Sequence, residues 1–213
     1  AALTTSTTGA GNTAIGRDSL AANTTGAQNV AVGHDALDAQ TTASFNTAVG
    51  YGAGGGNITG VEMVAVGYEA LLSSTETGQT AVGYKAGRLS TGDDNTFMGA
   101  FAGTAATSGD QNTFMGTFAG DALTTSSYNV AVGYLSLSTE TAGTSNTAIG
   151  SQALSTQNTS GGGAIYNTAV GTSAGRLVTT GTNNTLIGGL AGDAMTTGAS
   201  NTFVGQNAGG ATT

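Results

Sequence analysis

The sequence contains no cysteine, no proline and no tryptophan, and it has a single histidine. Without cysteine there is no disulfide and no thiol chemistry. The absence of proline suits continuous backbone hydrogen-bonded ladders, because proline removes an N–H donor. We find no nucleophile–base pair, no phosphate-binding loop and no carboxylate pair. The sequence therefore predicts a protein that is not an enzyme and that uses no metal and no cofactor.

Charge is also scarce, and most of it is negative. Charged residues make up 8% of the chain, which has a net charge of −8 and only four basic residues. Recognition of nucleic acid requires clustered lysine and arginine, so a nucleic-acid partner is excluded. No apolar run approaches the roughly 18 residues of a membrane span, so direct membrane insertion is not expected. Because the chain starts without methionine and shows no signal peptide, we expect it to be a piece of a longer protein.

What the chain does contain is a repeat. A five-residue phrase, Asn-Thr-Ala-Val-Gly or a near variant, occurs twelve times, mostly 17 residues apart, with two intervals of 16 and one of 21. A short fixed period is the signature of a solenoid, in which each repeat is one coil stacked on the last. We therefore predict an all-β, parallel β-solenoid of about twelve coils that forms one elongated domain over residues 1–213. The closing glycines are Gly16, Gly33, Gly50, Gly67, Gly83, Gly99, Gly116, Gly133, Gly150, Gly171, Gly188 and Gly205.

Positions within a coil are counted from that closing glycine as 0. Position −1 is always Val, Ile or Met, and position −2 is Ala in eight coils and Phe or Leu in the others. Because strand side chains alternate between faces, we expect position −1 to point into the coil and position −2 to point outward. An outward apolar stripe needs a cover, and a homo-oligomer supplies one. The predicted oligomer interface is Ala14, Ala31, Ala48, Ala65, Ala81, Phe97, Phe114, Ala131, Ala148, Ala169, Leu186 and Phe203.

The rest of the coil predicts a second short strand and a turn. Position +3 is Ala or Ser and position +4 is Gly or Leu, which we interpret as a second strand around +1 to +4, with a Thr-Thr-Gly stretch as the return turn. Twelve coils at about 4.8 Å each give a rod about 58 Å long. Position −4 is Asn in ten coils. These amides either form a ladder along the stack or bond only to local backbone.

The phrase followed by x-x-Ala-Gly, as in 46–54 and 167–175, resembles the head repeats of trimeric autotransporter adhesins (the YadA-like head) and similar repeats in phage tail fibres. The resemblance covers nearly the whole chain. It implies a left-handed parallel β-roll with three chains side by side, which is an extracellular structure on a bacterial cell surface or a virion. It also implies adhesion to a host surface.

Two groups of residues are candidates for a receptor-binding surface. Tyr51, Tyr68 and Tyr84 occupy position +1 in consecutive coils and should form an aromatic column, either as a recognition surface or as cross-coil packing. Ser160, Gly161 and Gly162 lie in the one long coil, where an added loop is either a receptor contact or a tolerated insertion.

Three other features favour structural interpretations. His34 is expected to be solvated rather than metal-bound. Asp93 and Asp110, one period apart, are expected to form solvated acidic turns rather than a Ca²⁺ site. A cluster of aromatic and methionine residues should be a core or a subunit-interface plug, and its members are Phe97, Met98, Phe101, Phe114, Met115 and Phe118.

We therefore predict a non-enzymatic fibre segment that attaches to a host-cell receptor or glycan, with affinity raised by three identical faces. One alternative is a purely structural filament or shaft. A second is an ice-binding solenoid, which the predicted burial of position −3 beside position −1 disfavours. A third, a polysaccharide-cleaving tailspike, lacks the acid pair it needs.

Overall fold

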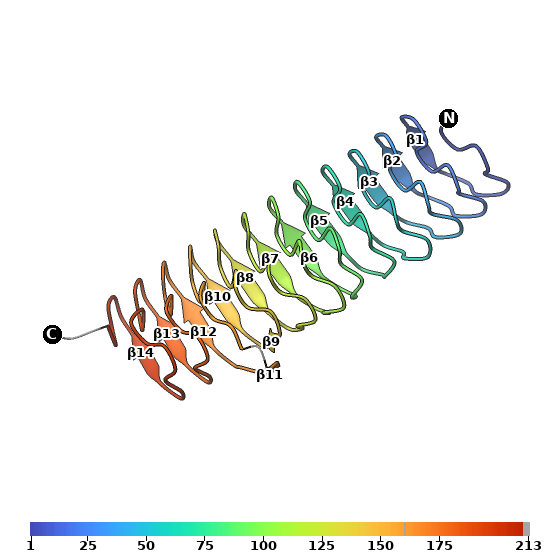
Figure 1. Ribbon diagram of the computed structural model, residues 1–213. Helices are drawn as coiled ribbons and strands as arrows, with labels where there is room; N and C mark the ends of the chain where they lie inside the picture. The colour runs from blue at the N-terminus through green and yellow to red at the C-terminus, as the bar shows by residue number, and fades with distance from the viewer. Residues whose placement is uncertain (160, 211–213) are drawn as a thin grey trace.

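The computed structural model describes residues 1–159 and 161–210. In these residues every regular element is a β-strand, and the chain winds into a long rod of stacked coils with β1 and β14 at opposite ends (Figure 1). Within the same stretches, no helix is long and apolar enough to cross a membrane. The predicted all-β parallel solenoid is confirmed.

One parallel sheet runs the length of the rod. It has twelve strands, and each strand pairs with the strands of the neighbouring coils, so that the strands follow one another along the sheet in chain order. A second, two-stranded sheet pairs β9 with β11. The strands are β1 Thr13–Ile15, β2 Val30–Val32, β3 Thr47–Val49, β4 Val64–Val66, β5 Thr80–Val82, β6 Thr96–Met98, β7 Thr113–Met115, β8 Val130–Val132, β9 Gly143–Thr144, β10 Thr147–Ile149, β11 Gly163–Ala164, β12 Thr168–Val170, β13 Thr185–Ile187 and β14 Thr202–Val204.

The repeat sets the register of the main sheet. Equivalent positions face one another throughout, as where Ala14 is opposite Ala31 and Ile15 is opposite Val32. The register also survives the 21-residue coil, because Ala148 of β10 is opposite Ala169 of β12. Like side chains therefore form continuous columns along the rod.

The predicted second strand at +1 to +4 is wrong: this segment is a run of turns. Its backbone alternates, with positive φ at +2 and +4 in every coil, as at Lys85 (56°) and Leu71 (49°). An extended strand needs negative φ throughout, so this alternation bends the chain. The closing glycine has a still rarer φ, from 122° to 144° across the coils. Only glycine adopts that conformation readily.

The predicted inside and outside of the strand are exchanged. Position −2 points into the coil, where Ala31, Ala148 and Phe97 are fully buried. Position −1 points outward: Ile15 is 60% exposed and Ile187 is 40% exposed. The predicted interface stripe is therefore interior. Ala31, Ala48, Ala65, Ala81, Phe97, Phe114, Ala131, Ala148, Ala169 and Leu186 are buried within their own chain, and Ala14 and Phe203, in the end strands, are partly buried against the same core.

The interior is thin, and positions −2 and +4 share it. Where −2 is Ala, as at Ala131, position +4 can be Leu, as at Leu137, and both are fully buried. Where −2 is Phe, position +4 is Gly. A Cβ added at Gly120 would lie 2.7 Å from the Phe114 ring. A large side chain at one of the two positions fills the space, and large side chains at both would overlap.

Met63 fills the interior of a coil in which positions −2 and +4 are both small. The coil that contains Ala48 has Gly54 at +4, so both shared positions are small. Met63, which replaces the usual Asn of the next coil, fills the space: its Cε would lie 2.5 Å from a Cβ at Gly54. Methionine adapts well to an irregular gap of this kind.

The asparagine ladder is confirmed. In most coils the Asn at −4 accepts a hydrogen bond from the backbone N–H of the next Asn, as where Asn129 donates to Oδ1 of Asn112 at 3.0 Å. The amide of Asn112 donates to the carbonyl oxygen of Ser126 at 2.8 Å and so ties its coil to the turn that precedes β8 in the next coil. Asn112 and Asn129 are buried, so these bonds satisfy polar groups that water does not reach.

Candidate functional site

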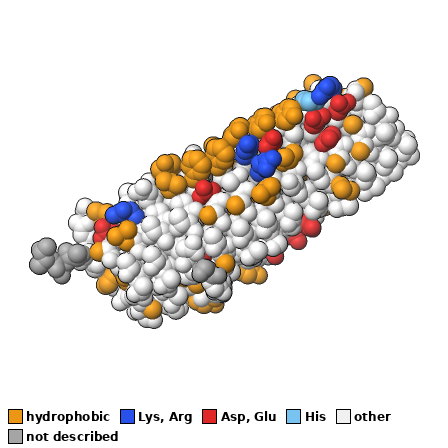
Figure 2. All heavy atoms as spheres, viewed as in Figure 1, with side chains coloured by type: hydrophobic (Ala, Val, Ile, Leu, Met, Phe, Trp, Pro, Cys, Tyr) orange, Lys and Arg blue, Asp and Glu red, His pale blue; other side chains and the backbone are white. Residues whose placement is uncertain are grey.

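The most distinctive surface is an aromatic column along one edge of the rod. It consists of His34, Tyr51, Tyr68, Tyr84, Phe101 and Phe118, one ring from each of six successive coils. Figure 2 shows a hydrophobic ridge that begins beside the single histidine and follows this edge. Neighbouring ring centroids are 5.0 to 5.2 Å apart.

The predicted stacking of the three tyrosines is confirmed. Tyr51 and Tyr68 are nearly parallel, at 10°, and Tyr68 and Tyr84 are at 14°. All three remain exposed on their outer edges. Stacking across coils holds the rings in one rigid row, because each ring is supported by the next.

The sequence did not reveal the full length of the column. Phe101 and Phe118 lie at position +2 rather than +1, and the sequence predicts a core or interface plug for them together with Phe97 and Phe114, which is wrong for Phe101 and Phe118. In the structure Phe97 and Phe114 are inside the coil, whereas Phe101 packs edge-on against Tyr84 and stacks on Phe118. The sequence does contain a signal for these two rings. Where position +1 is Ala100 or Thr117, the aromatic residue stands one position later, at +2.

Three charged residues flank the middle of the column. The Lys85 ammonium lies 5.2 Å from the centroid of the Tyr84 ring and 5.9 Å from that of Tyr68. Arg88 donates a hydrogen bond of 2.6 Å to Glu69, and this bond lowers the pKa of the Glu69 carboxyl below its usual value. The Lys85 ammonium is also 3.9 Å from Glu69. The ring faces therefore meet a cation here, while the acid is held by two bases.

His34 ends the column in a polar cluster. A carboxylate oxygen of Asp35 is 3.3 Å from its Nε2. Asp18, His34 and Asp35 bring three potential metal-ligand atoms within 4.8 Å of one another. The Nε of Arg17, however, donates to the same histidine nitrogen at 2.6 Å. A guanidinium thus occupies the position from which the imidazole would bind a cation.

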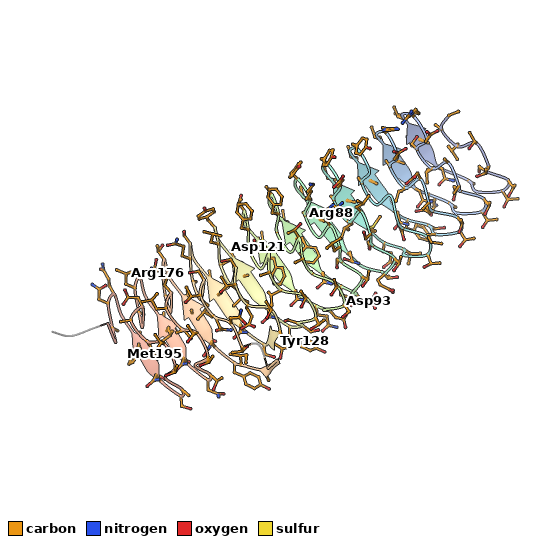
Figure 3. All side chains as sticks on the ribbon, viewed as in Figure 1. Arg88, Asp93, Asp121, Tyr128, Arg176 and Met195 are labelled. Carbon is orange, nitrogen blue, oxygen red and sulfur yellow. The ribbon has the colours of Figure 1, made fainter. Side chains whose placement is uncertain are left out.

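The acidic turns lie on the opposite edge. Figure 3 places Asp93 and Tyr128 at the lower edge of the rod, away from the hydrophobic ridge. Oδ1 of Asp110 accepts a hydrogen bond from the backbone N–H of Asp93 at 2.9 Å, and Oδ1 of Asp93 accepts one from Thr77 at 3.0 Å. These carboxylates therefore link consecutive turns.

The 21-residue coil is anchored by a buried carboxylate that the sequence did not single out. Glu140 Oε1 accepts the N–H of Gly143 at 2.9 Å, and Oε2 accepts the hydroxyl of Thr159 at 2.8 Å and the amide of Gln157 at 3.1 Å. Burial alone would raise the pKa of Glu140, but these hydrogen bonds outweigh it and the pKa is lowered. The available signal was an acid at +7, where every other coil has an uncharged residue.

The second predicted surface does not join the first. Gly161 and Gly162 lie just before β11, which Figure 1 places on the lower edge with β9. A Cβ at Gly161 would meet nothing within 4 Å, so its surroundings are open. Ser160 lies outside the described residues. The candidate surface is therefore the aromatic column alone, with the wide coil as a separate feature.

Comparison with known proteins adds no relative. No family model matches this sequence, and neither a curated protein nor a solved structure is significantly similar to it. The function is therefore argued from the surfaces themselves.

Proposed function

We propose that this chain is a non-enzymatic fibre segment that attaches to a host-cell receptor or glycan outside the cell, on a bacterial surface or a virion. The observation that carries the proposal is the aromatic column: six rings in a fixed row on a stiff rod, of which the three tyrosines are exposed. Tyrosine is enriched at recognition surfaces because it gives a large contact area at a small entropic cost.

The proposal includes assembly. Three copies, each a left-handed coil, lie side by side and present three columns at once. Three identical faces raise avidity without adding contacts. The support for three copies is the resemblance of the repeats to trimeric adhesin heads. The support for association in general is an exposed apolar strand face.

The binding test removes three tyrosines. A variant with Tyr51→Ala, Tyr68→Ala and Tyr84→Ala is expected to bind cells or arrayed glycans at least about tenfold more weakly than the native segment. The matched control is Phe45→Ala, Tyr128→Ala and Tyr166→Ala, which removes three exposed aromatics at position −5. That control is expected to bind like the native chain. Binding is measured by surface plasmon resonance and by flow cytometry.

One alternative is a structural shaft without its own receptor. The observation that favours it is that each ring in the column packs on its neighbours, which already gives the column a stabilising role. If the native segment shows no saturable binding to any cell or glycan, the shaft is preferred. If the tyrosine variant and the control bind equally, the column is not the attachment surface.

A further inference from the structure

The outward face of the main sheet carries an apolar column along its whole length. It is formed by position −1 of all twelve strands, with Thr or Val at −3 beside it. Because −2 is interior, both −3 and −1 point to the same outer side. The position −1 residues of this strand face are Ile15, Val32, Val49, Val66, Val82, Met98, Met115, Val132, Ile149, Val170, Ile187 and Val204.

The strand face is as large as the largest apolar patch of an ordinary monomer. Twelve strands about 4.8 Å apart make it about 53 Å long, and positions −3 to −1 span about 7 Å, or about 10 Å with their side chains. The product is about 500 Å², within the range of about 300–600 Å² for such patches, which are often functional. Two such faces packed together bury about 1,000 Å², the area that a specific protein interface needs.

The strand face is also free of charge. Positions −3 to −1 contain no acidic or basic residue in any of the twelve coils, although the chain carries a net charge of −8. Its acids lie in the turns, as Glu69 and Asp93 do, or inside, as Glu140 does. The backbone groups of the strands are already paired within the sheet. Covering the face therefore buries neither a charge nor an unpaired N–H group.

The spacing of the strand face is matched by another copy of the same chain. Every coil repeats the same pattern at the same interval, and the 21-residue coil does not break the register. A second rod laid alongside meets an equivalent residue at every step, whereas a partner with another period loses register after a few coils. We propose that the strand face docks further copies of this chain side by side. This inference rests on the assembly in the proposed function, and it identifies the surface through which the copies assemble.

The test places charges on the strand face. Val49→Lys, Val82→Lys and Val132→Lys together are expected to convert the assembly to monomers, because lysine cannot be buried there without a partner. The matched control is Thr25→Lys, Thr42→Lys and Thr125→Lys, at exposed position +9. It adds the same charge elsewhere and is expected to keep the native mass. Masses are measured by sedimentation velocity at equal concentrations, with circular dichroism to confirm folding.

Each outcome supports or overturns the inference. A native assembly that the face variant abolishes, and the control does not, supports it. If the face variant fails to fold, Val→Thr at the same three positions decides, with association expected to weaken by at least about tenfold. If the native chain assembles and these variants assemble equally well, the inference fails and the homotrimer stands.

A folded native monomer overturns both the inference and the proposed homotrimer. Attachment to a receptor is then still tested by the cell-binding experiment. Thermal hysteresis from such a monomer would identify the face as ice-binding.

Discussion

Replacing Phe114 with alanine is expected to destabilise the solenoid by about 3–5 kcal/mol, the usual cost of removing a buried phenylalanine. The Phe114 ring fills the space over Gly120, where no side chain can replace it. The neighbouring ring, Phe97, is 5.6 Å away and would lose its partner as well. The cavity lies in a thin interior with little material to collapse into it.

A second substitution, at Gly120, is expected to restore much of the stability that Phe114→Ala removes. Gly120→Leu alone should also destabilise, because its Cβ would lie 2.7 Å from the Phe114 ring. In the double variant, Phe114→Ala with Gly120→Leu, the coil acquires the Ala and Leu pair that the next coil has at Ala131 and Leu137. The backbone allows the leucine, since φ is 57° at Gly120 and 51° at Leu137.

Urea denaturation of the four proteins at one concentration measures the coupling. We expect the two changes to compensate by about 2 kcal/mol or more. Equal concentrations matter because association contributes to apparent stability. Additive losses would show that positions −2 and +4 do not share one interior space.

A single methyl group at a closing glycine is expected to be about as damaging. Gly188→Ala should destabilise by about 3–5 kcal/mol, since it adds both backbone strain and overlap. Its φ is 131°, and a Cβ there would lie 2.5 Å from the carbonyl oxygen of Gly205 in the next coil.

The adjacent glycine is a matched control. Gly189 has no positive φ, and the nearest atom to an added Cβ is 3.9 Å away. Gly189→Ala should therefore leave the thermal midpoint nearly unchanged, while Gly188→Ala lowers it by many degrees. Similar midpoints for the two variants would contradict the account of why the phrase always ends in glycine.

Much of the fold could be predicted because the sequence repeat corresponds to a structural repeat, one coil of the solenoid. A constant period requires equivalent residues to stack, so the parallel sheet, its register and the Asn129-type ladder all follow from spacing. The stacking of Tyr51, Tyr68 and Tyr84 follows for the same reason. Neither inference depends on which side of the strand is buried.

Hydrophobicity alone assigns the inside and the outside of the strand wrongly. Positions −1 and −2 are both apolar in every coil, and the side chains at −1 are uniformly large and aliphatic, yet the small alanine at −2 is what a narrow coil can contain. The decisive signal is that the side-chain sizes at positions −2 and +4 are correlated. A large residue at −2, such as Phe114, occurs with glycine at +4, such as Gly120. Such compensation occurs only between side chains that share a space.

The candidate surface was partly predictable. A column at +1 is visible in the sequence, but Phe101 joins it from +2 because of the local turn, where its φ is 61°. The anchoring of the wide coil by Glu140 depends on three successive backbone N–H groups, Thr141 to Gly143, that converge on one oxygen. No spacing rule predicts that convergence.

The most direct test of the inside–outside assignment uses two neighbouring residues and the absence of native cysteine. Ala148→Cys and Ile149→Cys are prepared separately and treated with a thiol reagent or a mild oxidant under native conditions. Ala148 is fully buried and Ile149 is 37% exposed. We expect the cysteine at 149 to be labelled or to cross-link to another copy, and the cysteine at 148 to react only on unfolding. Rapid reaction or cross-linking at 148, with protection at 149, would contradict the account.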